Sequence, residues 1–154
     1  MKVKALIKKF LPYFLLSFYH YLMALVGAII FGFSSRKLIV IGVTGTSGKS
    51  TTVDFITRIL EKSGSKVASI SSIRFKIGQN ERKNTLKMTM PGRFKIQKFL
   101  SQAVKERCKY AVLEVTSEGI KQFRHKFINF NTVVFTNLSP EHIESHGGFE
   151  NYRV

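Results

Sequence analysis

The stretch GVTGTSGKSTT, residues 42–52, lies between an apolar run and a helical pattern. The run before it, KLIVIGV at residues 37–43, is apolar and rich in β-branched residues, which is typical of a strand buried on both faces of a parallel sheet. The run after it, residues 50–63, places apolar residues on one helical stripe, and Gly64 follows as a helix-ending residue. A glycine-rich turn in this position aims backbone N–H groups and the positive helix end at an anion. The stretch therefore predicts a phosphate-binding loop.

The residues of this loop suit a nucleotide. Glycines at 45 and 48 allow the tight backbone, Lys49 supplies a charge for the outer phosphates, and Ser50 can hold Mg²⁺. Val43 stands where the common phosphate-loop pattern has its first glycine, but none of these roles needs a glycine there. We predict that the nucleotide is bound by Gly45, Thr46, Ser47, Gly48, Lys49, Ser50 and Thr51.

The rest of the chain continues the alternation of strands and helices. Apolar runs at residues 66–71, 110–115 and 131–136 are expected strands, and residues 92–108 form an expected helix. Such an alternation predicts an α/β fold, a parallel sheet with helices on both faces. The polar segment 73–87 fits either a hairpin or a loop.

An apolar segment precedes this pattern. Residues 10–33 contain no Lys, Arg, Asp or Glu, and as a helix they would be about 36 Å long, enough to cross a membrane. Lysines before the segment and polar or small residues within it disfavour a simple span, and the length disfavours a signal peptide. We expect an apolar N-terminal helix, residues 1–35, that lies on a membrane surface or packs on the nucleotide-binding domain, residues 36–154.

Composition limits the class of protein. The chain has 154 residues and is 44% hydrophobic, enough for one domain with a core. The single cysteine excludes an internal disulfide. The formal net charge of +16 attracts phosphorylated molecules, anionic lipid or nucleic acid. The basic residues form no dense run or nucleic-acid-binding motif, so we expect no nucleic acid partner.

Four motifs together give a more specific indication. They are GVTGTSGKSTT at 42–52, TMP at 89–91, LEVTSEGIKQFR at 113–124 and VFTNLSPEHIESHGGFENY at 134–152. In this order they resemble the Mur ligase family, whose ATP loop commonly lacks the first glycine. Within that family the nearest likeness is to the UDP-N-acetylmuramoyl-tripeptide synthetases, because an arginine follows the strand-end glutamate at the same spacing. The resemblance covers about residue 38 to the end.

The resemblance implies an ATP-dependent amide-bond ligase of peptidoglycan precursor synthesis in the cytoplasm. ATP would phosphorylate a carboxylate of a UDP-N-acetylmuramoyl-peptide, and the amine of an amino acid would attack the resulting acyl phosphate. The matched positions give Lys49, Glu114 and His142 catalytic roles, and Ser50, Glu114 and His142 as ligands of Mg²⁺. Cations are required because triphosphate and carboxylate repel each other.

The muramoyl-peptide side of the site is implied at Thr89, Thr116, Ser117 and Arg124. Helix capping is the alternative for Thr116 or Ser117, and a solvated charge is the alternative for Arg124. The sequence departs from the family pattern at Ser47, Met90, Thr116, Glu118 and Glu141. Most of these departures concern the substrate rather than ATP.

Two domains of the family have no counterpart in these motifs. The apolar segment stands where the family has a uridine-nucleotide domain, and the C-terminal domain that receives the amino acid does not follow. A metal-bridging carbamylated lysine would lie beyond Val154. We therefore expect a fragment, incomplete at its C-terminus and inactive alone. A non-catalytic ATP-binding module anchored by its N-terminal helix and a folylpolyglutamate synthetase relative are the alternatives.

Overall fold

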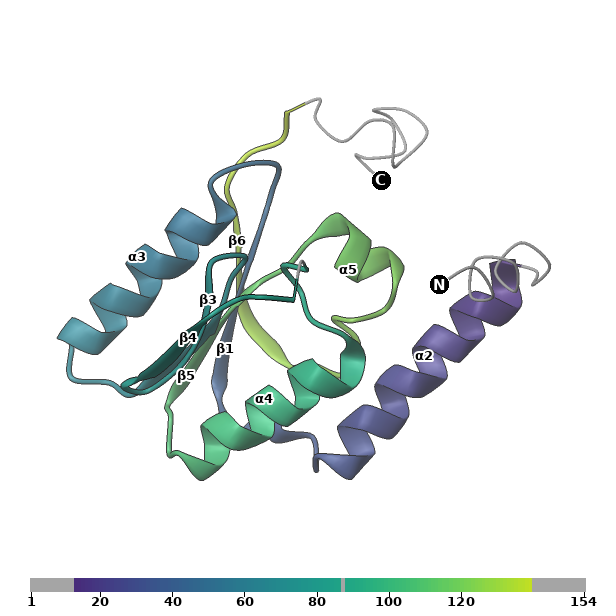
Figure 1. Cartoon of the computed structure of the whole chain (residues 1–154), viewed down its shortest axis with the longest axis horizontal. Helices are drawn as coiled ribbons and strands as arrows, with labels where there is room; N and C mark the ends of the chain where they lie inside the picture. The colour runs from purple at the N-terminus through teal and green to yellow at the C-terminus, as the bar shows by residue number, and fades with distance from the viewer. Residues whose placement is uncertain (1–12, 87, 140–154) are drawn as a thin grey trace.

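The computed structural model describes residues 13–86 and 88–139 (Figure 1). In chain order its elements are α2 (Tyr13–Ile30), the 3-10 turn η1 (Ser34–Lys37), β1 (Ile39–Thr44), α3 (Lys49–Lys62), β2 (Val67–Ile70), β3 (Arg74–Ile77), β4 (Asn80–Lys83), α4 (Arg93–Lys105), β5 (Tyr110–Glu114), α5 (Ser117–Lys121) and β6 (Phe130–Phe135). Each strand and helix predicted between residues 36 and 136 is present, with ends that differ by at most three residues. Helix α2 lies within the predicted N-terminal segment 1–35, of which residues 1–12 lie outside the described part of the chain.

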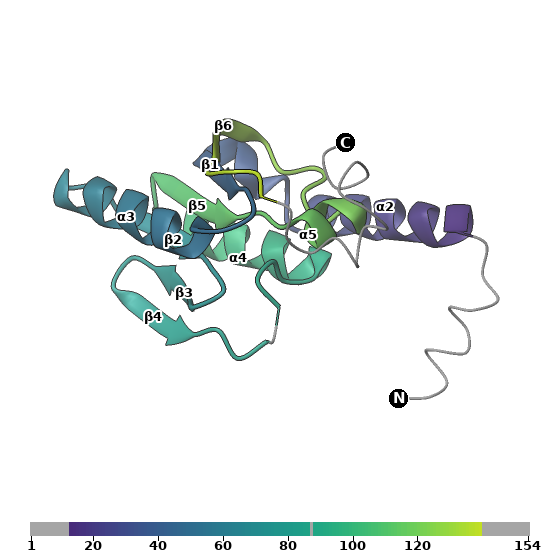
Figure 2. The same cartoon turned by 90° about the horizontal axis from the view of Figure 1, so that it is seen from above.

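The strands form one six-stranded sheet in the order β4-β3-β2-β5-β1-β6. Strands β2, β5, β1 and β6 are parallel, so their carboxyl ends meet at one edge. The strands predicted to be parallel are parallel, and the sheet is mixed because β3 pairs antiparallel with both β2 and β4. Residues 73–87, whose sequence fits either a hairpin or a loop, contain the β3–β4 hairpin. Figure 2 shows this hairpin at the end of the sheet away from β6. Gly78, with a φ of 56°, lies in the short turn where the chain reverses.

Helices cover both faces of the sheet, as predicted. Alternate residues of β5 show this: Val112 packs in a cluster with Val53 of α3, whereas Leu113 packs in a cluster with Ile96 and Leu100 of α4. The alternation follows from the two-residue period of a strand, and burial on both faces explains why β5 is apolar throughout.

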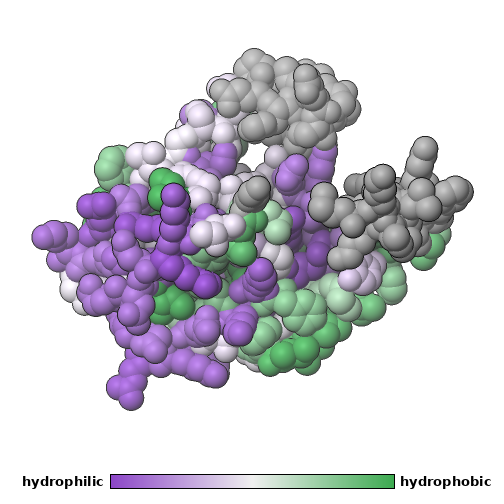
Figure 3. Space-filling model, viewed as in Figure 1, coloured by the Kyte–Doolittle hydropathy of each residue, from purple (hydrophilic) through white to green (hydrophobic). Residues whose placement is uncertain are grey.

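Helix α2 packs outside α4 and forms a further layer on that face (Figure 1). Ala24 and Ala28 are buried, and a Cβ on Gly27 would lie 3.8 Å from the Arg93 carbonyl oxygen, so small residues let the two helices approach closely. The outer side of α2 exposes large apolar residues, which gather along it in Figure 3. None of the helices in the described part of the chain is long and apolar enough to cross a membrane.

Candidate functional site

The predicted phosphate-binding loop connects β1 to α3 at the carboxyl edge of the parallel strands. Gly45 has a φ of 133° and Gly48, directly before α3, a φ of 78°, both in the region that favours glycine. At Gly45 an added Cβ would lie 2.2 Å from the Thr136 hydroxyl oxygen. A glycine is therefore needed at position 45 for two reasons. The backbone conformation favours glycine, and the segment that follows β6 approaches too closely for a side chain.

That following segment holds the loop by several hydrogen bonds. Thr46 N donates to the Asn137 carbonyl oxygen at 3.0 Å, and Ser47 N donates to Asn137 Oδ1 at 3.0 Å. The Thr136 hydroxyl donates to the Ser47 carbonyl oxygen at 2.8 Å, and Ser139 N donates to Thr46 Oγ1 at 2.9 Å. Asn137 was missed as a site residue, although it lies within the T-N-L motif at 136–138. These bonds fix the loop before any ligand binds.

Lys49 is the first residue of α3, and its side chain lies over the loop. Its Nζ donates to the carbonyl oxygens of Gly45, at 2.7 Å, and Thr46, at 2.6 Å. These bonds hold the ammonium charge beside the positive end of the helix, where phosphate oxygens are favoured.

Glu114, at the end of β5, lies against the start of α3. Its side chain is 3% exposed, and one oxygen, Oε2, accepts from the Ser50 hydroxyl at 2.8 Å and from Ser72 N at 2.8 Å. The hydroxyls of Ser50 and Ser72 are 2.6 Å apart. The structure thus brings together Ser50 and Glu114, two of the three predicted magnesium ligands, and adds Ser72, which sequence analysis did not identify.

This arrangement fits Mg²⁺. Mg²⁺ prefers oxygen ligands and usually keeps several waters and phosphate oxygens beside one or two protein groups. Within residues 13–86 and 88–139, Glu114 forms no ion pair, although a buried carboxylate is costly without a cation. The same residues contain no group of three His, Cys, Asp or Glu side chains that could hold a metal, so protein ligation here would rest on Ser50 and Glu114. His142 lies outside the described residues.

Arg124 is buried, at 8% exposed, so the reading of it as a solvated charge is wrong. Its Nη1 donates to the Met90 carbonyl oxygen, and its Nη2 donates to Gln122 Oε1 at 2.7 Å. Burial lowers the pKa of Arg124, and the nearby carboxylate of Glu118 acts in the opposite direction. Arg124 therefore connects the chain after α5 to the T-M-P segment at 89–91.

The remaining predicted substrate residues lie around α5. The Thr116 hydroxyl accepts from Gly119 N at 3.1 Å and caps the helix, as the capping alternative predicted. Ser117 begins α5 and is half-buried, as is Thr89. A Cβ on Gly119 would lie 2.5 Å from Met90 Sδ, so α5 packs directly on the T-M-P segment.

Arg93, the first residue of α4, joins this group although sequence analysis did not single it out. Its Nη2 donates to the Gln122 carbonyl oxygen at 2.5 Å. Burial lowers the pKa of Arg93, the positive charge of Arg124 lowers it further, and Tyr19 of α2 raises it. Two arginines thus lie side by side between α4, α5 and the T-M-P segment.

Comparison with known proteins identifies the family of this chain. The Mur ligase middle domain family matches residues 43–154. The UDP-N-acetylmuramoyl-L-alanyl-D-glutamate--2,6-diaminopimelate ligase of Syntrophomonas wolfei is 37% identical over 132 residues, which are 86% of this chain and 27% of that protein. The UDP-N-acetylmuramyl-tripeptide synthetase of Treponema pallidum is 38% identical over 128 residues, 82% of this chain and 24% of that protein.

A solved structure gives the same result. The structure of a UDP-N-acetylmuramoyl-L-alanyl-D-glutamate--2,6-diaminopimelate ligase superposes with a TM-score of 0.66 and 29% identity, over 75% of this chain and 23% of that one. The chain spans about a quarter of the length of these relatives. The family resemblance of the four motifs is confirmed, and because the family matches most of the sequence, the chain belongs to the Mur ligase family and carries its middle domain.

Proposed function

We propose that this chain is the ATP-binding part of an ATP-dependent carboxylate–amine ligase that adds an amino acid to a UDP-N-acetylmuramoyl-peptide in the cytoplasm. The names of the relatives support this substrate class. The observation that carries the proposal is the placement of Lys49, Ser50 and buried Glu114 together at the carboxyl edge of parallel strands, where α/β sheets bind ligands.

The chemistry assigns each of these residues a task. Bound ATP would transfer its γ-phosphoryl group to the substrate carboxylate and leave as ADP, and the amine of the amino acid would then displace phosphate from the acyl phosphate to form the amide. The loop N–H groups and Lys49 bind and neutralise the phosphates, while Ser50 and Glu114 hold Mg²⁺. His142 is the proposed ligand of a second metal. Together these cations reduce the repulsion between two anionic reactants.

On the substrate side we propose that the muramoyl-peptide lies along the T-M-P segment and the start of α5, with Thr89, Thr116 and Ser117 nearest to it. Arg124 holds the Met90 carbonyl, so it would shape this surface as well as supply charge. Helix α5 begins three residues after Glu114, so the phosphate side and the peptide side of the site are joined through the end of β5. This proximity is what transfer between ATP and a peptide carboxylate requires.

The first test is nucleotide binding. Lys49→Ala should abolish the thermal stabilisation by Mg·ATP, which for the unaltered chain is about 2.7 kcal/mol at a ligand concentration 100 times Kd. Lys62→Ala, at the other end of α3, is the matched control and should leave the stabilisation unchanged. Equal stabilisation of both variants would refute the assignment of the loop.

The second test is turnover. Because the matched part of this chain is only about a quarter of each relative, we expect this 154-residue polypeptide to bind Mg·ATP without ligation. ADP release would be measured with UDP-muramoyl-dipeptide, ATP, Mg²⁺ and a panel of amino acids, beside a polypeptide extended along the downstream reading frame. Turnover by both at one rate would contradict this expectation.

We also propose that α2 makes a peripheral contact with the inner face of the plasma membrane. Phe14 is 68% exposed, Phe18 62% and Ile30 62%, and lysines precede the helix in the sequence. The test is co-sedimentation with anionic vesicles. Phe18→Glu with Ile30→Glu should release the protein, whereas Phe55→Glu with Ile59→Glu on α3, at residues equally exposed, should not.

A further inference from the structure

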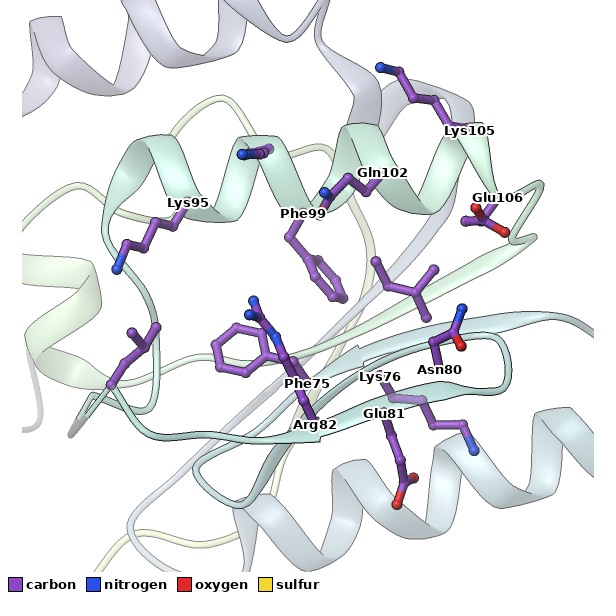
Figure 4. Close-up of a pocket in the computed structure, with 13 residues that line it drawn as sticks. Phe75, Lys76, Asn80, Glu81, Arg82, Lys95, Phe99, Gln102, Lys105 and Glu106 are labelled. Carbon is purple, nitrogen blue, oxygen red and sulfur yellow. The ribbon is translucent and has the colours of Figure 1, made fainter.

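A second hollow lies on the face of the sheet opposite α3, away from the phosphate loop. It has a volume of about 790 Å³ and lies between α4 and the β3–β4 hairpin (Figure 4). Its lining includes no residue of the stretch 42–52 and not Glu114. The volume is in the range of pockets that bind small organic ligands.

The floor of this pocket is apolar. Phe99 points from α4 toward Phe75 of β3, and the two rings meet edge to face with centroids 6.1 Å apart (Figure 4). Leu86, from the segment after the hairpin, adds to the lining. The guanidinium of Arg82 lies 5.3 Å from the Phe75 ring centroid and reaches from β4 toward α4. An aromatic floor beneath a cation suits a ligand with an apolar body and a negative group.

The acidic groups at this pocket are already paired. Glu81 accepts from Arg74 at 3.0 Å and Glu106 pairs with Lys66 at 3.1 Å, and neither cation belongs to the lining. In Figure 4 the side chain of Glu81 points away from α4. These carboxylates therefore do not neutralise the pocket.

The cations are different. Lys76 points away from the pocket and pairs with Glu61 of α3 at 2.9 Å. Arg82, Lys95 and Lys98 also line the pocket, and none of them forms an ion pair within the described part of the chain. A hollow with an apolar floor and several unneutralised cations favours an anion that carries more than one negative charge.

We propose that this pocket is a second anion-binding site, separate from the phosphate loop, that takes a small organic molecule with an apolar ring and a phosphate group. A phosphate dianion is favoured over a carboxylate because several cations share the rim. The apolar ring lies against Leu86 and the exposed edges of Phe75 and Phe99, and Arg82, Lys95 and Lys98 contact the phosphate. The proposal does not depend on the ligase function.

Titration calorimetry at low salt with four probes tests both parts of the proposal. Naphthyl phosphate should bind most tightly, and naphthoate, naphthol and inorganic phosphate should each bind at least about tenfold more weakly. Tight binding of inorganic phosphate that persists in Lys49→Ala would overturn the role of the aromatic floor. Tight binding of naphthol would overturn the role of the cations, and no binding of naphthyl phosphate would overturn the site.

Variants then locate the bound probe. The triple variant Arg82→Gln, Lys95→Gln, Lys98→Gln should lose at least about tenfold in affinity for naphthyl phosphate. The matched control Arg58→Gln, Lys62→Gln, Lys126→Gln removes the same charge at residues outside the lining, two of them on α3 across the sheet, and should change affinity by less than about twofold.

A third variant separates this site from the phosphate loop. Lys49→Ala should leave the binding of naphthyl phosphate unchanged. Equal losses in both triple variants would show attraction to the overall charge, and a loss in Lys49→Ala would place the probe at the phosphate loop. Either result would overturn the second site. Thermal melts of each variant confirm that it is folded.

Discussion

Glu114 and Arg124 are both charged, both buried and close in sequence, yet their surroundings differ. Glu114 accepts hydrogen bonds from a hydroxyl and a backbone N–H, which are neutral, and forms no ion pair among the described residues. Arg124 donates to two carbonyl-type oxygens and connects α5 to the T-M-P segment. The carboxylate therefore keeps its capacity for a cation, whereas the guanidinium already stabilises the fold. A buried charge alone does not distinguish a ligand-binding residue from a structural one.

Arg124→Met should produce the largest loss of stability. It leaves the Met90 carbonyl and the Gln122 side chain without their buried donor, so we expect the free energy of unfolding to fall by about 3 kcal/mol. Urea denaturation measures this, with Arg58→Met as the control because Arg58 is 65% exposed. A loss as small as that of the control would mean that Arg124 does not hold the T-M-P segment.

Glu114→Gln should act in the opposite direction on the protein without ligand. The amide keeps an oxygen for Ser72 N but has no charge to desolvate, so the free energy of unfolding should stay equal or rise by about 1 kcal/mol. Stabilisation by ATP should then be the same in Mg²⁺ and in EDTA. Glu106→Gln, which is exposed, should keep the Mg²⁺ dependence. A Mg²⁺ dependence retained in Glu114→Gln would remove Glu114 from the proposed metal site.

Ser72→Ala tests how Glu114 is held. It removes the hydroxyl beside Ser50 and keeps the backbone N–H to Glu114, so we expect a loss of about 0.5–1 kcal/mol in unfolding free energy. The affinity for Mg·ATP should fall severalfold, and Ser72→Thr should restore it. Failure of threonine to rescue the affinity would mean that the hydroxyl does not position the metal ligands.

The smallest effect on stability is expected at His125, the residue after Arg124. Burial lowers its pKa and Lys126 lowers it further, so the unfolded chain, with a pKa near 6.5, binds the proton more readily. The contribution of the neutral His125 ring to the free energy of unfolding is therefore fully present above about pH 6.5 and is lost as the pH falls below that value. His125→Gln should reduce the loss between pH 7 and 5 by less than about 0.5 kcal/mol, because the group is half-exposed. A pH dependence that becomes steeper in His125→Gln, or one that falls by much more than this, would contradict this assignment.

The central strands could be predicted because burial on both faces makes them apolar throughout. The helices could be predicted because their apolar residues fall on one side. The sequence left the β3–β4 segment open, since its outer residues are polar and their pairing depends on a strand elsewhere in the chain. At the site, Lys49 and Ser50 could be predicted from the strand–loop–helix order, and Glu114 from its position in a motif that resembles the family. Ser72 and Asn137 could not, because they reach the loop only after the sheet aligns strand ends that are far apart in sequence.

The two outer strands of the sheet have different consequences for self-association. Strand β4 is exposed at all four residues and reads Asn-Glu-Arg-Lys, a charged edge that discourages another chain from adding a strand. Strand β6, at the other edge, exposes Val133 at 61% and Phe135 at 60%, and within the described residues it pairs only with β1. If copies of this polypeptide associate at high concentration, they should pair through β6, and a lysine at position 133 should keep them apart.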